Sequence, residues 1–305
     1  MGHDHHHSHS KDLRGKNLVV SIILNFAITI AEVIGGLVSN SLALLSDALH
    51  NFGDSSALII AYLAHHISKK DYTDKKTFGY KRIEIIAALF NAVVLLVIII
   101  YLFYEAVKRF SNPEPIKGKI MFIVAFIGLL ANLFSVYLLR NDSQKSINIK
   151  AAYLHLLGDT VSSFAVLIGA VFIYFFRQYW IDPLITILVG VYLLRETFLI
   201  LKQTVDILMQ GTPKGLDLEK VKKDLEQIPE IDNIHHIHAW NLTDQEIHFE
   251  CHVDLVDDWR VSQTEKIKSK MHEILLNKFN ITHVTVQYEY NCCDDKGMIH
   301  SHEKK

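Results

Sequence analysis

The sequence is poor in cysteine and in net charge, and it lacks the pattern of a leader segment. The chain of 305 residues has 3 cysteines, an odd number that includes an adjacent pair, which argues against a framework of disulfides. The formal net charge is −2, so nothing indicates a nucleic-acid partner. No apolar core with a small-residue cleavage site precedes the first long apolar stretch. We therefore expect no signal peptide, and we expect the first long helix itself to direct membrane insertion.

Apolar residues are abundant and unevenly spread. They make up 50% of the chain, and most of them lie in its first two thirds. A helix of about 20 residues crosses a hydrocarbon layer of about 30 Å, and six stretches are long enough. We expect spans at 18–38, 42–63, 85–107, 120–139 and 151–176, and a sixth that starts after position 183 and ends near 201. Lysine and arginine favour one set of loops by about twelve to five, which places both termini in the cytoplasm.

The composition predicts four parts along the chain. Residues 1–16 would be a His-rich cytoplasmic tail, 17–208 a six-helix transmembrane domain, 209–291 a cytoplasmic domain and 292–305 a C-terminal tail. The histidines between positions 3 and 9 suit a native disordered tail that collects metal ions. A remnant of a purification tag is the alternative.

The part after the last span has the pattern of a small α/β unit. The order predicted is a helix over 218–227, strands over 234–242 and 247–255, a helix over 262–279 and a strand over 283–290. Asp217 is suited to cap the first of these helices. Two helices on one face of an antiparallel sheet form a core that is marginal alone, so pairing with a second copy would stabilise it.

Two histidine–aspartate pairs lie inside long apolar stretches, His50 with Asp54 and His155 with Asp159. An aspartate at the middle of a membrane helix opposes insertion by about 2.5–3.5 kcal/mol, so such placements need a compensating partner. Residues four apart share a helix face, and each pair therefore offers a nitrogen and an oxygen to one point. Two facing helices would supply four ligands, which suits tetrahedral Zn²⁺ and also other transition metals.

A salt-bridge network without metal is the alternative for these pairs. Polar contacts between membrane helices contribute about 0.6–2 kcal/mol each, which does not offset the insertion penalty. Asp47, three residues before His50, suits a structural or access role better than a fifth ligand. Glu32 in the first span either lines the route of the ion or extends to the membrane interface, and the pattern does not decide between them.

Histidines also cluster on the predicted strands. Strand alternation would place His236 and His238 on one face of the sheet and His235 on the other. At most two of these three could then share one metal site. Exposure is the expected state of three histidines on or beside the strands, His238, His248 and His283.

Two further features are a cysteine on the second predicted strand and a polar cluster at the end of the second span. Cys251 is expected to face away from the side of its neighbour His252, so we interpret it as a buried thiol. His65 and His66 end the second span, and Asp71 follows shortly after. A weak metal site with His65 and Asp71 as ligands is a possibility there, with ordinary interfacial polar residues as the alternative.

The chain resembles the cation diffusion facilitator family of zinc transporters, of the cobalt–zinc–cadmium efflux type, over nearly all of its length. The segments that carry the resemblance occur in the family's order and are SLALLSDALHNFGD at 41–54, FGYKRIE at 78–84, AAYLHLLGD at 151–159 and HHIHAW at 235–240. The resemblance implies a homodimer in the lipid bilayer. Each copy would have six membrane helices, a four-ligand zinc site between spans two and five, and a ferredoxin-like cytoplasmic domain.

The resemblance also implies roles for individual residues. The transport ligands would be His50, Asp54, His155 and Asp159, and the ligands of a regulatory zinc in the cytoplasmic domain would be His235, His252 and Glu289. A histidine at position 50 favours zinc over cadmium in the family, with cobalt or cadmium as further substrates. Cys292 and Cys293 resemble a C-terminal cysteine pair of some relatives, but they are adjacent here, whereas the relatives space them.

The function expected is secondary transport rather than enzyme catalysis. Zinc and protons would compete for the same lone pairs, and zinc would leave the cytoplasm as protons enter through alternating access. His50 and His155 are the expected proton carriers because their unperturbed pKa of about 6.5 is near working pH. An intramembrane zinc hydrolase and a passive channel or metal sensor are the rival hypotheses. Short loops and compact length favour a bacterial inner membrane.

Overall fold

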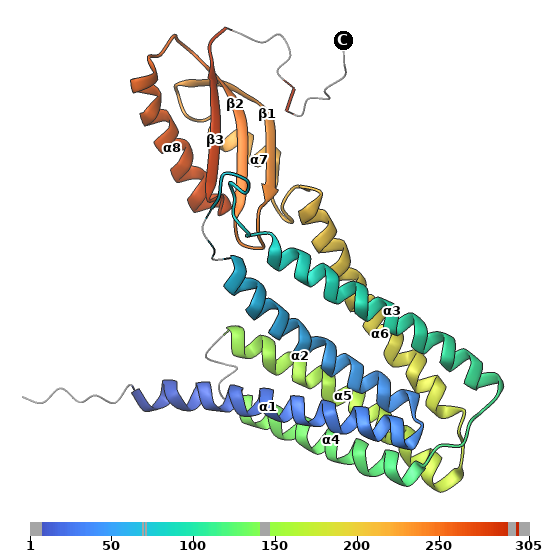
Figure 1. Cartoon of the computed structure of the whole chain (residues 1–305). Helices are drawn as coiled ribbons and strands as arrows, with labels where there is room; N and C mark the ends of the chain where they lie inside the picture. The colour runs from blue at the N-terminus through green and yellow to red at the C-terminus, as the bar shows by residue number, and fades with distance from the viewer. Residues whose placement is uncertain (1–7, 69, 71, 141–146, 292–296, 299–305) are drawn as a thin grey trace, which may run out of the picture. The chain divides into compact units, whose positions relative to one another are not determined.

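The computed structural model describes residues 8–68, 70, 72–140, 147–291 and 297–298 (Figure 1). Six long helices come first, and a small α/β arrangement follows. The long helices are α1 (Ser8–Ser39), α2 (Leu42–Ser68), α3 (Ile83–Ser111), α4 (Gly118–Leu139), α5 (Ile147–Phe176) and α6 (Ile181–Leu208). The remaining elements are α7 (Leu218–Leu225), β1 (Ile231–Asn241), β2 (Ile247–Leu255), α8 (Val261–Phe279) and β3 (His283–Glu289).

The chain divides into two compact units. The first comprises Met1–Ile60 and Phe90–Leu199, and the second Ala61–Leu89 and Ile200–Lys305. The helix α1 starts at Ser8, ahead of the expected span, so the part of the predicted disordered tail after residue 7 is helical instead. Lys, Leu and Arg residues there are good helix formers, and a helix extends readily once it is nucleated.

In the first unit, apolar side chains cover the outside and polar side chains lie inside, as in membrane proteins. Five described helices are long and apolar enough to cross a membrane, over 20–39, 83–111, 118–139, 152–176 and 181–208. The helix α2, with 27 residues, is also long enough, and it carries the polar residues Asp47, His50 and Asp54. Large apolar side chains such as Val97 and Phe175 are exposed on the outside. Polar side chains are instead buried between helices, which is favourable only if they find partners there.

Close helix contacts fix the register of α1 against α4. A Cβ atom at Gly35 would lie 2.8 Å from Val124, and one at Gly128 would lie 2.6 Å from the Glu32 carboxylate. Residue numbers rise along α1 as they fall along α4, so the two helices are antiparallel, and Figure 1 shows them side by side. Small residues at such positions let membrane helices approach closely.

The N-terminus of α2 is capped by a side chain from α6. Asp182 is buried and accepts hydrogen bonds from the backbone N–H groups of Leu42 (2.8 Å) and Ala43 (3.3 Å), and from the Ser41 hydroxyl (2.5 Å). A carboxylate is the favoured partner for these unpaired donors and for the positive end of the helix dipole. Asp182 therefore holds the start of the helix that carries half of the predicted transport site.

The sheet of the second unit has the order β1-β2-β3 and is mixed. The strands β1 and β2 are antiparallel, as expected, but β2 and β3 are parallel, so the prediction of an antiparallel sheet is wrong. The physical reason is the helix α8, whose length allows the chain to cross back and enter β3 in the direction of β2. Asp217 caps α7 as predicted by accepting a hydrogen bond from the Lys220 N–H. The core between helices and sheet includes Val221, Ile234, Phe249, Val253 and Met271.

A bulge in β1 changes which histidines share a face. His235 pairs with His252, and the next regular pair is His238 with Glu250, so β1 has one residue more than β2 over this stretch. The extra residue is His236, whose φ of 51° is rare outside glycine. His235 and His238 consequently lie on the same face of the sheet. The prediction that His235 and His238 lie on opposite faces is wrong because simple alternation ignores the bulge, whereas the ring of His236 does lie beside that of His238, with 4.8 Å between the ring centroids.

Candidate metal centres

The four predicted transport ligands lie together between α2 and α5. His50 Nε2 is 3.2 Å from Asp159 Oδ1, and His155 Nε2 is 3.3 Å from Asp54 Oδ2. Within each helix, His50 Nδ1 is 3.4 Å from Asp54 Oδ2, and His155 Nε2 is 3.6 Å from Asp159 Oδ2. Each carboxylate therefore approaches both imidazoles, as the spacing of four residues on two facing helices predicts.

These separations suit a shared ion better than direct hydrogen bonds. Donors at about 2.0–2.2 Å from a tetrahedral Zn²⁺ are held about 3.3–3.5 Å from one another, whereas a charged N–H···O bond is about 2.7–2.9 Å long. Asp54 Oδ2 and both carboxylate oxygens of Asp159 are buried and accept no hydrogen bond from the part of the chain that the structure describes. A divalent cation bound by one oxygen of each carboxylate would satisfy two of these three oxygens.

The four side chains of this transport site differ in their exposure to solvent. The side chain of Asp159 is 1% exposed and that of His50 11%, whereas Asp54 and His155 are 37% and 43% exposed. The Tyr192 ring of α6 lies 6.2 Å from the His50 ring, edge to face. An ion could therefore reach Asp54 and His155 first, and Asp159 would hold it in the interior.

Asp47 connects α2 to α5 through hydrogen bonds, one helical turn from the transport site. Its carboxylate accepts hydrogen bonds from the hydroxyls of Ser162 and Ser163, the latter at 2.8 Å. Asn132 of α4 donates to Ser163 at 3.0 Å and so connects a third helix. This geometry agrees with the structural role favoured for Asp47. The two serines were missed in the sequence, although they follow Asp159 by one helical turn on the same side.

Glu32 lies inside the bundle and does not extend to an interface. Its side chain is buried, and its carboxylate accepts a hydrogen bond of 3.1 Å from Asn51 of α2. Sequence reasoning overlooked Asn51, although its place directly after His50 was a signal. Asn91 accepts a hydrogen bond of 3.1 Å from Ser56, which joins α2 to α3.

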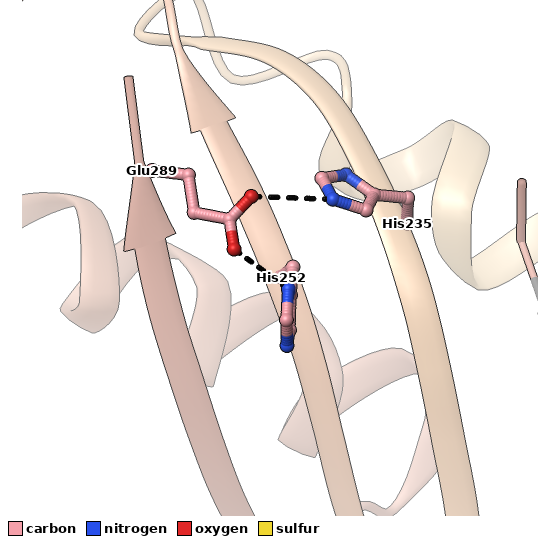
Figure 2. Close-up of side chains that lie close together, drawn as sticks. All are labelled: His235, His252 and Glu289. Carbon is pink, nitrogen blue, oxygen red and sulfur yellow. Dashed lines mark ion pairs between the residues drawn. The ribbon is translucent and has the colours of Figure 1, made fainter. Parts of the chain in front are cut away.

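The second cluster uses one residue from each strand of the sheet, as Figure 2 shows. His235 Nε2 on β1 is 3.3 Å from Glu289 Oε2 on β3, and His252 Nδ1 on β2 is 2.7 Å from Glu289 Oε1. One ligand atom from each lies within 4.8 Å of the others. Gln287 donates to Glu289 Oε1 at 2.8 Å and orients the carboxylate. Two imidazoles and a carboxylate in this arrangement could hold a zinc ion.

Cys251 and His248 lie on the same strand as His252 but are not proposed as ligands of the metal. Cys251 is buried on the core face, and burial raises the pKa of its thiol to about 12, so it is a poor metal ligand at neutral pH. His248 is 6% exposed, and the prediction that it is exposed is wrong. It packs between the rings of Trp240 (5.4 Å), Phe78 (5.5 Å) and His283 (4.4 Å). Burial, followed by the charge of His283, lowers the pKa of His248.

Some predicted positions lie outside the described residues. Asp71, Cys292, Cys293 and the histidines at positions 3–7 are outside as whole residues. For His9 and His65, only the side chains are outside. The weak site assigned to His65 and Asp71 and the role of the cysteine pair therefore stay predictions.

Comparison with known proteins places the chain among cation efflux proteins. Residues 18–209 match the family described as cation efflux transmembrane domain, and residues 213–291 match the cation efflux protein cytoplasmic domain. The cadmium, cobalt and zinc/H(+)-K(+) antiporter of Bacillus subtilis is 38% identical over 291 residues, which are 95% of this chain and 92% of the relative. The metal cation efflux system protein CzcD of Cupriavidus metallidurans is 38% identical over 293 residues, 96% and 91% of the two chains. The zinc transporter ZitB of Escherichia coli is 35% identical over 298 residues, 96% and 94% of the two chains.

Proposed function

The chain belongs to the cation efflux family, and we propose that it exports zinc in exchange for protons through His50, Asp54, His155 and Asp159. Membership makes it a multi-pass membrane protein that expels divalent cations. Zinc is specified in the names of two of the three relatives above, and one of these names also specifies cadmium, cobalt and protons. Cobalt and cadmium are accordingly proposed as further substrates.

The observation that carries the proposal is the pair of N···O separations between α2 and α5, 3.2 Å from His50 Nε2 to Asp159 Oδ1 and 3.3 Å from His155 Nε2 to Asp54 Oδ2. They are close to the N···O edges of a tetrahedral zinc site with two nitrogens and two oxygens, which are about 3.3–3.5 Å long. All four positions are filled by protein groups, whereas a hydrolytic zinc site keeps one position open for water. The geometry therefore favours carriage of the ion over hydrolysis.

Competition between zinc and protons follows from the charges at the site. With neutral imidazoles the four side chains carry two negative charges, which one Zn²⁺ neutralises. Protons on the same nitrogen and oxygen atoms also neutralise them, and a bound proton removes a lone pair that zinc needs. If the bundle opens alternately to the two sides, an inward proton gradient drives zinc outward.

The cytoplasmic domain is proposed to sense zinc and to pair with a second copy. His235, His252 and Glu289 would hold a regulatory zinc, and zinc binding would link the three strands. The match to a cytoplasmic domain of this family and the excess of loop cations on one side both support cytoplasmic termini. Relatives from bacteria support a place in a bacterial inner membrane.

Proteoliposomes with a buffered acidic interior test the transport function. Zinc supplied outside at the same total concentration as inside should accumulate when the interior is acid and should not accumulate without a pH difference. The Asp159→Asn variant should not accumulate zinc, because the carboxylate that contacts both imidazoles is lost. Zinc movement that only dissipates its own gradient would identify a channel, and absence of movement with zinc still bound would identify a sensor.

A further inference from the structure

Buried polar atoms form a line along α1. Ser21, Asn25 and Glu32 follow one another at intervals that return to the same helix face. Eleven residues separate the first from the last, which is about 16 Å along a helix or half of a hydrocarbon layer. Ser21 Oγ and Asn25 Oδ1 are buried, and neither has a hydrogen-bond partner among the described residues.

The facing side of α4 is also polar. Gly128 contacts Glu32, and Asn132 and Ser135 lie one and two turns further along the same side of α4. Because the two helices are antiparallel, these residues lie level with the stretch of α1 between Glu32 and Ser21. Asn132 Oδ1 and Ser135 Oγ are buried and again find no partner in the described part of the chain. We call Ser21, Asn25, Asn132 and Ser135 the polar seam.

Buried polar groups without a hydrogen-bond partner are unfavourable in the hydrocarbon region of a membrane. An unsatisfied polar group in hydrocarbon costs several kcal/mol, and buried water is the usual partner when protein groups are missing. Four such groups along one helix interface therefore favour a file of water molecules between α1 and α4. Hydrogen-bonded water conducts protons, whereas a passage lined by single amide and hydroxyl oxygens offers Zn²⁺ no site with four ligands.

Glu32 lies at one end of the polar seam, and its carboxylate can bind a proton. Its hydrogen bond to Asn51 connects it to α2, directly beside His50 in the sequence. The charged groups that act on Glu32 are Asp47 on α2 and Asp159 on α5, while Gly128 of α4 lies against its carboxylate. A zinc ion at Asp159 reduces the negative potential at Glu32, and departure of zinc restores it.

We propose that Glu32 carries one of the exchanged protons, and that the polar seam leads this proton to the end of the bundle where α1 begins. The inference rests on the proposed exchange of zinc for protons and adds a proton position separate from the four zinc ligands. Glu32 takes up a proton when zinc leaves the site. When zinc binds from the cytoplasm, Glu32–COOH releases the proton to water in the seam and becomes the carboxylate.

The proton-to-zinc ratio distinguishes this inference from proton binding by the zinc ligands alone. With the membrane potential clamped at zero, each coupled proton allows a tenfold zinc gradient per pH unit of proton gradient. In proteoliposomes with a pH difference of one unit, Glu32→Gln should sustain a zinc gradient about tenfold smaller than the wild type. Zinc affinity measured by calorimetry should change less than twofold. An unchanged gradient in Glu32→Gln would overturn the inference, whereas a wild type that sustains no gradient would instead refute the proposed function.

A second variant keeps the inference testable if Glu32→Gln does not fold. The double variant Ser21→Ala, Asn25→Leu leaves the zinc ligands and Glu32 in place but removes polar groups from the seam. Its proton-driven zinc uptake should be at least fivefold slower, while zinc–zinc exchange without a pH difference keeps the wild-type rate. Thr29→Val is the matched control, because the buried Thr29 hydroxyl already donates to the Asn25 carbonyl at 2.8 Å. Equal proton-driven rates in the double variant, the control and the wild type would contradict the seam.

Discussion

Replacing Asp159 by leucine should separate the stability of the empty protein from its ability to bind zinc. The aspartate is 1% exposed, and its insertion into a membrane helix costs about 2.5–3.5 kcal/mol. The substitution removes this cost and also removes contacts to His50 and His155, each contributing about 0.6 kcal/mol. Leucine has a similar size and can pack among the apolar neighbours. The metal-free variant should therefore be about 1–2 kcal/mol more stable than the metal-free wild type.

Thermal unfolding in nanodiscs, with and without zinc, measures both effects. The cytoplasmic site is first disabled in every chain by His252→Ala, so that only the transport site responds. Zinc at a hundred times its dissociation constant should stabilise the parent chain by about 2.7 kcal/mol and the Asp159→Leu chain by almost nothing. Ser163→Ala, one turn away on α5, is the control and should keep the response to zinc. A metal-free Asp159→Leu chain that is less stable than its parent, or that keeps the full zinc response, would refute this reasoning.

Three further predictions concern the second unit. His252→Ala should lower bound zinc by one ion per chain in equilibrium dialysis without abolishing transport, since His252 supplies one of three ligands in the sheet; unchanged zinc content would exclude this site. In a chain with Cys292→Ser and Cys293→Ser, Cys251 should react with a maleimide at pH 8 only after denaturation, because burial raises its pKa to about 12; rapid native labelling would contradict its placement. Burial lowers the pKa of His248, so the unfolded chain binds the proton more readily and stability should fall as the pH drops through about 6.5. His248→Phe should flatten this decline in urea unfolding curves, and an equally steep decline would assign it to other groups.

The transport site is the part that local sequence spacing specifies best. A separation of four residues fixes the relative directions of His50 and Asp54 on any α-helix, and the same holds for His155 and Asp159. Only the pairing of α2 with α5 was left to decide, and the cost of buried carboxylates makes that pairing favourable. The strand β2 was likewise predicted with its observed ends, because turn residues flank an alternating segment on both sides.

The features that escaped prediction depend on contacts between distant segments. The bulge at His236 is accompanied by hydrogen bonds from the backbone of His236 and Ile237 to the carbonyls of Gly297 and Met298, sixty residues further along the chain. The parallel direction of β3 depends on how α8 packs across the sheet. The polar seam became visible only once α1 was placed against α4, because single serines and asparagines in an apolar helix do not reveal which side is buried.

The central claim is that two nitrogens and two oxygens from α2 and α5 hold the transported ion. X-ray absorption spectroscopy at the zinc edge, on the full chain with His252→Ala and one equivalent of zinc, tests it most directly. The account predicts four nitrogen or oxygen neighbours at about 2.0–2.2 Å, with imidazole scattering that disappears when His50 and His155 are both replaced. Sulfur neighbours at about 2.3 Å, or a spectrum that those two replacements leave unchanged, would contradict it.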